Sequence, residues 1–469
     1  MRKLYASIAL SCLSSLMFGY VLSSLNIPLL DNNKPGFIGY DIPELKDATN
    51  KQIATSASII AAMISSFITS FFADKYGRRF VLLFNDVFYI SGAIISAYFT
   101  NFSLFCVGRF LSGFGVGVSS IVVPLITSEI STTQVRGFAA VATQLGVVSG
   151  ILSAVVIGFF ASNLAHGWRV SVGFLAIPAI IQLFCFKIIP ESPRWIAGKT
   201  VKFDKEGDLK EKLLSCLNGI RPVNHDFEEE INQLMMSSRQ SKSTSGFKLK
   251  GCFKPLFIGI FLNLVQQFSG INAVIYYSSQ IFESAGFHGL EDVATVITMG
   301  VNFISTIVAI YLVDKLGRKS LLLTGLSGQL FSLLVLSFAS IIAIPESNLF
   351  ILINLIGMFA YIACFAIGAG AVLWPIITEV FPDKSRASGV SICLFVNWTC
   401  NLVISLFFLS VVEYFNYNLS PIFNSFAGVC VVGIVGVVMF IPETKGKKFE
   451  AIAELLGINK ADEEAGLLV

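Results

Sequence analysis

Long apolar runs separated by short polar segments dominate this chain of 469 residues. A helix that crosses a bilayer needs roughly 20 mostly apolar residues. No alternation with a period of two dominates the runs, which argues against a transmembrane β-barrel. A helix also satisfies every backbone hydrogen bond internally, as lipid demands. The pattern predicts an all-α membrane protein with twelve spans, at approximately 4–30, 54–72, 80–99, 104–126, 138–160, 168–189, 255–282, 293–313, 320–344, 349–377, 388–412 and 421–441.

Lys and Arg are distributed unevenly between the polar segments. Basic residues favour the cytoplasmic side of a membrane. With both termini in the cytoplasm, the outer loops hold only Lys34, Lys46 and Lys51, and most of the 33 basic residues lie inside. The reverse orientation would invert this bias. We therefore expect both termini in the cytoplasm.

The polar segment 190–252 separates the spans into two groups of six. Its charge predicts a cytoplasmic linker, with short amphipathic helices near 208–218 and 227–237. The expected organisation is an N-terminal six-helix bundle, this linker, a C-terminal six-helix bundle and a cytoplasmic tail. In residue numbers these are 1–189, 190–252, 253–441 and 442–469.

The composition supports a membrane location and excludes several classes of function. Hydrophobic residues make up 54% of the chain, charged residues 13%, and the mean hydropathy is +0.75, whereas soluble domains are about a quarter charged. The net charge of +3 gives no reason to expect nucleic acid. With three His residues, and without a phosphate-cradling loop or a nucleophile constellation, we expect no enzyme activity, no catalytic residue, no cofactor and no metal.

The two halves of the chain repeat three motifs at nearly constant offsets. Such parallel repeats predict two homologous bundles that rock around a substrate site near the bilayer midplane. The pairs are Asp74–Arg79 with Asp314–Lys319, Glu129 and Arg136 with Glu379 and Arg386, and Pro190–Ser192 with Pro442–Thr444.

The repeated charges fall at cytoplasmic helix ends in the predicted topology. Ion pairs among them would hold the cytoplasmic side closed and break when it opens, as a two-state element requires. The alternative is that they only anchor loops and fix the topology, since exposed ion pairs contribute little. We favour a cytoplasmic gate formed by Arg78, Glu129, Arg136, Arg318, Glu379 and Arg386.

With these motifs the chain resembles the sugar porters of the major facilitator superfamily, the group that contains the facilitative glucose transporters. The resemblance covers about residues 13 to 455 and implies twelve helices and sugar transport. It rests on Gly77-Arg78-Arg79, Gly108-Arg109-Phe110, Arg136-Gly137, Pro190–Arg194, the segment Gln266–Asn272, Gly317-Arg318, Asn397-Trp398 and Pro442–Gly446.

A hexose site needs neutral groups that both donate and accept hydrogen bonds, and side-chain amides do so without a buried charge. An aromatic ring can cover the apolar face of the sugar. The alternative is that these amides only bond helices to one another. The resemblance assigns sugar contact to Gln144, Gln266, Gln267, Asn272, Asn302, Trp374 and Asn397, with Ile271 and Phe365 as apolar neighbours.

On a straight helix Gln267 and Asn272 would lie about 140° apart. Both can face one cavity only if the helix bends between them. Ser269-Gly270 supplies a break of the kind that discontinuous transporter helices use.

Two departures from the family pattern bear on mechanism and substrate. Proton-coupled members carry an acid after the Gly-Tyr pair of the first span, where this chain has Val21. Asp86 is the only carboxylate within a span, and an intramembrane charge is a functional candidate. In the tenth span Ala366 stands where many relatives have Glu, which leaves the preferred sugar open.

The sequence thus predicts facilitative uniport of a hexose, most simply D-glucose, by a protein of the plasma membrane. A proton-coupled symporter and a polyol or inositol transporter remain alternatives, as does a sugar-sensing receptor with a transporter fold. The expected partners of the protein are a small sugar and the lipid bilayer, and the sequence leaves its oligomeric state open.

Overall fold

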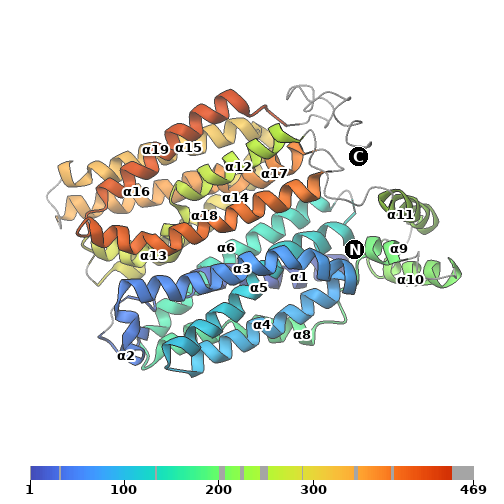
Figure 1. Ribbon diagram of the computed structural model, residues 1–469, viewed down its shortest axis with the longest axis horizontal. Coiled ribbons are helices and arrows are strands. Elements are labelled where there is room, and N and C mark those ends of the chain that lie inside the picture. Colours follow the sequence, from blue (N-terminus) through green and yellow to red (C-terminus); the bar gives the residue numbers. More distant parts are fainter. Residues whose placement is uncertain are drawn as a thin grey trace. The chain divides into compact units, whose positions relative to one another are not determined.

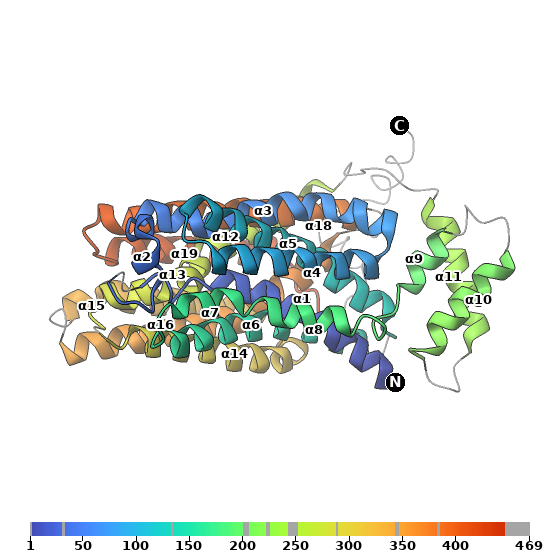
Figure 2. The ribbon, with the colours of Figure 1, turned by 90° about the horizontal axis from the view of Figure 1, so that it is seen from below.

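The computed structural model of the protein describes residues 2–30, 33–132, 135–199, 206–221, 226–242, 252–287, 289–342, 347–381 and 385–445. Within these ranges 12 helical stretches are long and apolar enough to cross a membrane, which confirms the predicted all-α architecture. Figures 1 and 2 show the helices that form these stretches.

Nine of the spans are single helices, and three are divided into two. The single ones are α1 (Arg2–Ser23), α3 (Ala48–Tyr76), α4 (Arg78–Tyr98), α5 (Phe102–Ile130), α6 (Arg136–Ala161), α14 (Glu291–Leu316), α15 (Arg318–Ile342), α18 (Arg386–Tyr414) and α19 (Ser420–Phe440). The divided ones are α7 (Gly167–Gly173) with α8 (Ala176–Phe184), α12 (Phe253–Phe268) with α13 (Ile271–Ser284), and α16 (Asn348–Ile367) with α17 (Ala369–Val380).

Between the spans, the residues that the structure describes form five short helices. The first loop contains α2 (Ile38–Asp41) and the 3₁₀ helix η1 (Pro43–Lys46). The polar segment between α8 and α12 forms α9 (Pro193–Gly198), α10 (Glu206–Asn218) and α11 (Phe227–Lys242), which confirms the short helices expected there. Figures 1 and 2 show α9, α10 and α11 packed together.

The contacts divide the chain into two compact units. The first contains Met1–Val21, Ile60–Gly150 and Arg169–Gly246, and the second contains Leu22–Ile59, Ile151–Trp168 and Phe247–Val469. Their boundaries fall inside α1, α3 and α6. The two six-helix halves drawn from the repeat therefore stay a prediction.

Small residues allow close helix packing in the first unit, where α4 lies against α5 and α8. A Cβ added at Gly92 would come within 2.3 Å of Ser112 Oγ, and one at Gly108 within 2.3 Å of Ser96 Oγ. Transmembrane helices associate through such small-residue interfaces because lipid provides no hydrophobic driving force.

The second unit has its own apolar core. Residues of α12, α15, α17, α18 and α19 form one buried cluster that includes Leu262, Leu326, Ile376, Cys393 and Val437. Here too a glycine pair brings two helices close, since a Cβ at Gly325 would lie 2.4 Å from Gly368 Cα.

One buried arginine links the short helices between α8 and α12 to α5. Arg221 donates from Nε and Nη2 to the Glu230 carboxylate at 2.7–3.2 Å, and from Nη1 to the carbonyl of Ile130 at 2.7 Å. Its side chain is only 3% exposed. Arg221 therefore fixes the start of α11 against the end of α5.

We predict that Arg221→Ala loosens α10 and α11 and leaves the spans intact. Hydrogen bonds to charged groups contribute about 2 kcal/mol, so amide exchange in these helices should rise about 30-fold. Hydrogen–deuterium exchange of the purified protein measures this, with the exposed Lys210→Ala as the control. Unchanged exchange in α11 would contradict the anchoring role.

Candidate functional site

The seventh span is interrupted where the sequence predicts a break. α12 ends at Phe268 and α13 begins at Ile271, and Gly270 between them has φ +99°, in the left-handed region. A Cβ at Gly270 would lie 2.4 Å from the ring of Phe426. Both the backbone conformation and the space thus require glycine.

The break brings two of the predicted sugar ligands together. Asn272 Nδ2 donates to Gln267 Oε1 across it. Both side chains are 5% exposed. The two amides, which a straight helix would hold about 140° apart, thus meet on one side.

Gln266 links the break to two other helices. Its Nε2 donates to the carbonyl of Ala369 in α17 at 3.1 Å, and its Oε1 accepts from Asn397 Nδ2 of α18 at 3.2 Å. Asn397 Nδ2 also donates to Asn263 Oδ1 at 2.8 Å. Four predicted amides, Gln266, Gln267, Asn272 and Asn397, therefore gather around one helix break.

Three members of this polar cluster, Asn263, Tyr276 and Tyr361, were not among the predicted ligands, whereas Asn401 is a weaker candidate from the sequence because it lies one turn beyond Asn397. Asn263 lies one turn before Gln267 on the same helix, a spacing that could have found it. Tyr276 donates to Asn401 Oδ1 at 2.8 Å, and Tyr361 donates to the carbonyl of Ser269 at 2.9 Å. Tyr361 thus satisfies a backbone group at the break itself, a role that sequence spacing does not reveal.

The remaining predicted ligands lie outside these hydrogen bonds. Ile271 is buried at the start of α13, and Asn302 is buried in α14. Phe365 and Trp374 are half-buried and pack against the apolar core of the second unit. Gln144 is half-buried in the part of α6 that belongs to the first unit.

The cluster is chemically suited to a neutral polar ligand. Each amide offers two N–H donors and an oxygen with two lone pairs. The hydrogen bonds named above use only neutral groups. A polyhydroxylated molecule can therefore replace them without leaving a buried charge unpaired.

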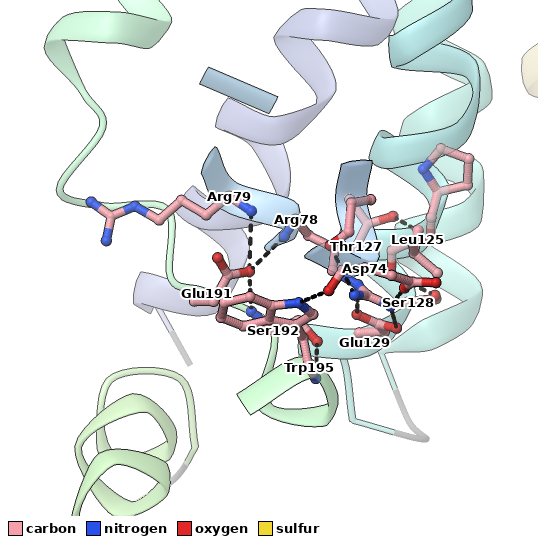
Figure 3. A network of polar contacts seen from close by, with 12 residues as sticks. Asp74, Arg78, Arg79, Leu125, Thr127, Ser128, Glu129, Glu191, Ser192 and Trp195 are labelled. Carbon is pink, nitrogen blue, oxygen red and sulfur yellow. Dashed lines mark hydrogen bonds and ion pairs between the residues drawn. The ribbon is translucent and has the colours of Figure 1, made fainter. Parts of the chain in front are cut away.

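A second network surrounds the start of α4 in the first unit (Figure 3). Arg78 Nε donates to Glu129 Oε2 at 3.0 Å, and Arg78 Nη2 pairs with Asp74 at 3.0 Å. The side chains of Arg78 and Glu129 are 11% and 8% exposed, so this pair is largely shielded from water. The structure thus brings Arg78 and Glu129 together as an ion pair, and their role in a gate stays a prediction.

The side chain of Glu191 caps the N-terminus of α4. Its Oε1 accepts from the backbone N–H of Arg78 at 2.9 Å and of Arg79 at 3.1 Å (Figure 3). Gly77 has φ +103°, and a Cβ there would lie 2.3 Å from Glu191 Oε2. The carboxylate thus satisfies N–H groups that a helix start leaves without partners, and its charge complements the helix dipole.

The second unit repeats this arrangement at the start of α15. Glu443 accepts from the backbone N–H of Arg318 at 2.9 Å and of Lys319 at 3.1 Å, and Gly317 has φ +90°. Arg318 Nη2 lies 3.3 Å from Glu379 Oε1. The sequence repeat revealed both acidic residues, Glu191 and Glu443, but their role as helix caps was missed.

The contacts of two predicted gate residues cannot be described. The side chains of Arg136 and Arg386 lie outside the part of the protein that the structure describes. Their participation in the gate stays a prediction.

Two residues of the first unit bear on proton coupling. Arg109 is 2% exposed and donates from Nη2 to the carbonyl of Val21 at 3.0 Å. The arginine therefore contacts the backbone of the residue that stands where proton-coupled relatives have an acid. Asp86 is fully buried in α4, and neither of its oxygens has a hydrogen-bond partner among the described residues.

The two capping carboxylates differ in their acidity. Burial raises the pKa of Glu191 above its ordinary value, although the N–H groups of Ser192, Arg79 and Arg78 oppose this. Burial also disfavours the charge on Glu443, but backbone N–H groups of Lys445, Arg318, Lys319 and Ser320 outweigh it and lower the pKa of Glu443. The lowered pKa of Glu443 means that its ionised form stabilises the fold, and this stabilisation is lost as the pH falls through the pKa of Glu443. The raised pKa of Glu191 has the opposite effect on folding stability: the stabilisation linked to it is present at low pH and is lost as the pH rises through the pKa of Glu191.

We predict that acidification protonates Glu191 before Glu443. Among the signals of the 30 acidic side chains, infrared difference spectra recorded during a pH titration should contain those of Glu191 and Glu443 with separate midpoints. Glu191→Gln should remove the signal with the higher midpoint, and Glu443→Gln the lower one. A reversed order would contradict the assignment of the two environments.

Comparisons of the sequence with known proteins identify its family. A family model described as Sugar (and other) transporter matches residues 7–456. Plastidic glucose transporter 4 of Arabidopsis thaliana is 33% identical over 462 residues, which cover 95% of this chain and 79% of the relative. Myo-inositol transporter 1 of Candida albicans is 29% identical over 471 residues, which cover 95% of this chain and 82% of that protein.

The fold is also similar to that of a solved transporter. The inward-open xylose transporter XylE from E. coli superposes with a TM-score of 0.77 at 22% identity, covering 96% of this chain and 99% of that one. At this identity the likeness supports the fold alone. The family model and the Arabidopsis relative carry the assignment: the chain belongs to the sugar porter family of the major facilitator superfamily, a family of membrane transporters for small sugars and not of enzymes.

Proposed function

We propose that the protein carries out facilitative transport of a hexose, D-glucose in the first instance, by alternating access. The observation that carries this proposal is the set of neutral amides around the break between α12 and α13. Gln267 bonds Asn272, and Gln266 bonds Asn397. We assign sugar contact to these four residues and, from the sequence, to Gln144, Ile271, Asn302, Phe365 and Trp374.

The chemistry of the site supports a neutral sugar. Hydroxyl groups of a hexose replace amide–amide bonds one for one, so the polar groups remain satisfied when the sugar binds. A ligand that lacks a hydroxyl leaves a buried amide unpaired, which is the basis of selectivity. The relatives of this chain include a plastidic glucose transporter and a myo-inositol transporter. A cyclic polyol is therefore the second candidate substrate.

The surroundings of Arg109 support uniport. A residue that carries protons must titrate, and the carbonyl of Val21, which accepts from Arg109, cannot. Symport is the alternative that Asp86 keeps open, because a buried carboxylate within a span is a candidate proton carrier.

The two charged networks support a cytoplasmic gate. Arg78 with Glu129, and Arg318 with Glu379, form pairs between helix ends within each unit. Alternating access requires contacts that form in one state and break in the other. We assign these pairs, together with Arg136 and Arg386, to that role. We further propose that both termini are cytoplasmic and that the protein resides in the plasma membrane.

The substrate assignment predicts that transport-deficient cells expressing this protein take up labelled glucose. Gln267→Ala and Asn302→Ala should each reduce uptake at least tenfold, the effect of losing about 1.4 kcal/mol of binding. Asn354→Ala is the matched control, because this buried amide of α16 donates to Phe350 of its own helix. If both site variants take up glucose normally, at equal amounts of protein at the cell surface, the assignment of the sugar site is refuted. If the wild-type protein takes up inositol faster than glucose, the substrate assignment changes to inositol.

The uniport assignment predicts that a protonophore leaves glucose uptake unchanged while the sugar gradient is kept. Asp86→Asn should likewise retain downhill uptake, because the amide has the size and shape of the carboxyl group that it replaces. The measurement is the initial uptake rate in vesicles with and without an imposed pH gradient. Uptake that collapses with the proton gradient and in Asp86→Asn would instead establish symport.

A further inference from the structure

A cavity of about 420 Å³ lies in the second unit, and none of the residues assigned to the proposed sugar site lines it. Its walls come from η1, the start of α3, the end of α13, the end of α18 and the loop after α18. All of these segments belong to one compact unit. Small-molecule sites have volumes of roughly 300–1,000 Å³, so this cavity has room for a ligand of its own.

The charged side chains around this cavity balance one another. Lys46 and Lys51 line it together with Glu283 and Glu413. Both carboxylates interact electrostatically with Lys51, but within the described part of the chain the ammonium group of Lys51 forms no direct ion pair. A ligand of either net charge would meet two like charges, which disfavours its binding. The cavity is therefore suited to a neutral ligand that both donates and accepts hydrogen bonds.

A buried amide that lines the cavity has unused hydrogen-bonding capacity. Gln280 is 8% exposed, and its Oε1 has no hydrogen-bond partner among the described residues. Its Nε2 lies 3.5 Å from the carbonyl oxygen of Asn26, a long distance for a hydrogen bond. A buried polar atom without a partner costs free energy, and a ligand that supplies the missing bond removes this cost. Because Oε1 is an acceptor, the group that it lacks is a donor such as a hydroxyl.

An unusual backbone conformation holds an aromatic ring at the cavity. Asn416 and Tyr417 have φ +51° and +63°, in the left-handed region that side chains other than glycine rarely adopt. Their N–H groups donate to the carbonyls of Glu413 and Val412 at 2.8 and 2.9 Å, so this turn caps the end of α18. Tyr417 lines the cavity and is 58% exposed, which leaves its ring accessible to a ligand. Strained residues of this kind cluster at ligand sites.

We propose that this cavity is a second sugar-binding site, separate from the amides around the break in the seventh span. Hydroxyl groups of a neutral sugar donate to Gln280 Oε1 and to the two carboxylates, and they accept from the two lysine ammonium groups. The ring of Tyr417 covers an apolar face of the sugar. The site shares the ligand class of the proposed function, but its occupation does not require transport.

The first test asks whether the cavity binds glucose when the proposed transport site is weakened. Hydrogen–deuterium exchange is measured on purified wild-type protein and on Gln267→Ala, each with and without D-glucose. At about ten times the dissociation constant, exchange that requires an empty site slows about tenfold. We expect this in residues 280–284 and 412–419 of both proteins. Unchanged exchange in both, or protection that Gln267→Ala abolishes, would overturn the second site. Protection without any glucose uptake would refute only the proposed transport.

The second test compares two adjacent substitutions, Tyr417→Gly and Asn416→Gly. Glycine adopts both positive φ values without strain, so both variants should fold and keep the melting temperature of the wild-type protein. Only Tyr417 lines the cavity. The glucose concentration needed for protection should therefore rise about fivefold in Tyr417→Gly, the effect of losing a ring contact, and stay unchanged in Asn416→Gly. Equal protection of the two variants would overturn the proposal.

The third test concerns the charge of the ligand. D-glucuronate has the ring of glucose and one carboxylate, which would lie near Glu283 and Glu413, so it should protect the same residues less than glucose does. Glu413→Gln removes one of these like charges and should strengthen the protection by glucuronate. If glucuronate protects the wild-type protein as well as glucose, or if Glu413→Gln leaves its effect unchanged, the proposed recognition of a neutral sugar by balanced charges is wrong.

Discussion

The satisfaction of backbone hydrogen bonds where helices are interrupted is the constraint on which this structure depends. Lipid offers no water to an exposed N–H or carbonyl, so each interruption needs a side chain to replace the missing partner. At the break in the seventh span Tyr361 bonds the carbonyl of Ser269, and further along α13 Asn26 bonds Ile275 and Ser279. The interruptions are therefore also the places where polar side chains gather, and polar side chains are what a sugar requires.

The same constraint accounts for the charged networks at the starts of α4 and α15. A helix that begins directly after a sharp turn presents unpaired N–H groups, and glycine with a positive φ makes the turn possible. Glu191 and Glu443 fill the space that a side chain at Gly77 or Gly317 would occupy, and they accept from the first N–H groups of each helix. Each repeat thus couples a glycine, a carboxylate and an arginine into one arrangement.

Charged and neutral polar side chains lie at different places in the fold because burying a charge costs more free energy than burying a neutral polar group. Around the break in the seventh span the polar side chains are amides and hydroxyls, whereas the pairs of Arg78 and Arg318 stand at helix ends. An uncharged site lets a neutral ligand exchange hydrogen bonds at little cost. Charged pairs suit contacts that must be strong in one state and absent in another, because removing one partner leaves the other charge uncompensated.

The sequence by itself determined the class of the protein, the twelve spans, the short helices of the linker and the break at Gly270, because hydropathy, glycine and repeated motifs are local properties of the chain. It also named the amides Gln266, Gln267, Asn272 and Asn397, which the fold brings together. Only the tertiary structure decided which groups these amides bond, that Glu191 and Glu443 cap helices, and that Asn26 reaches into α13. These pairings join residues far apart in the chain, and one sequence without a fold does not specify which distant donor meets which acceptor.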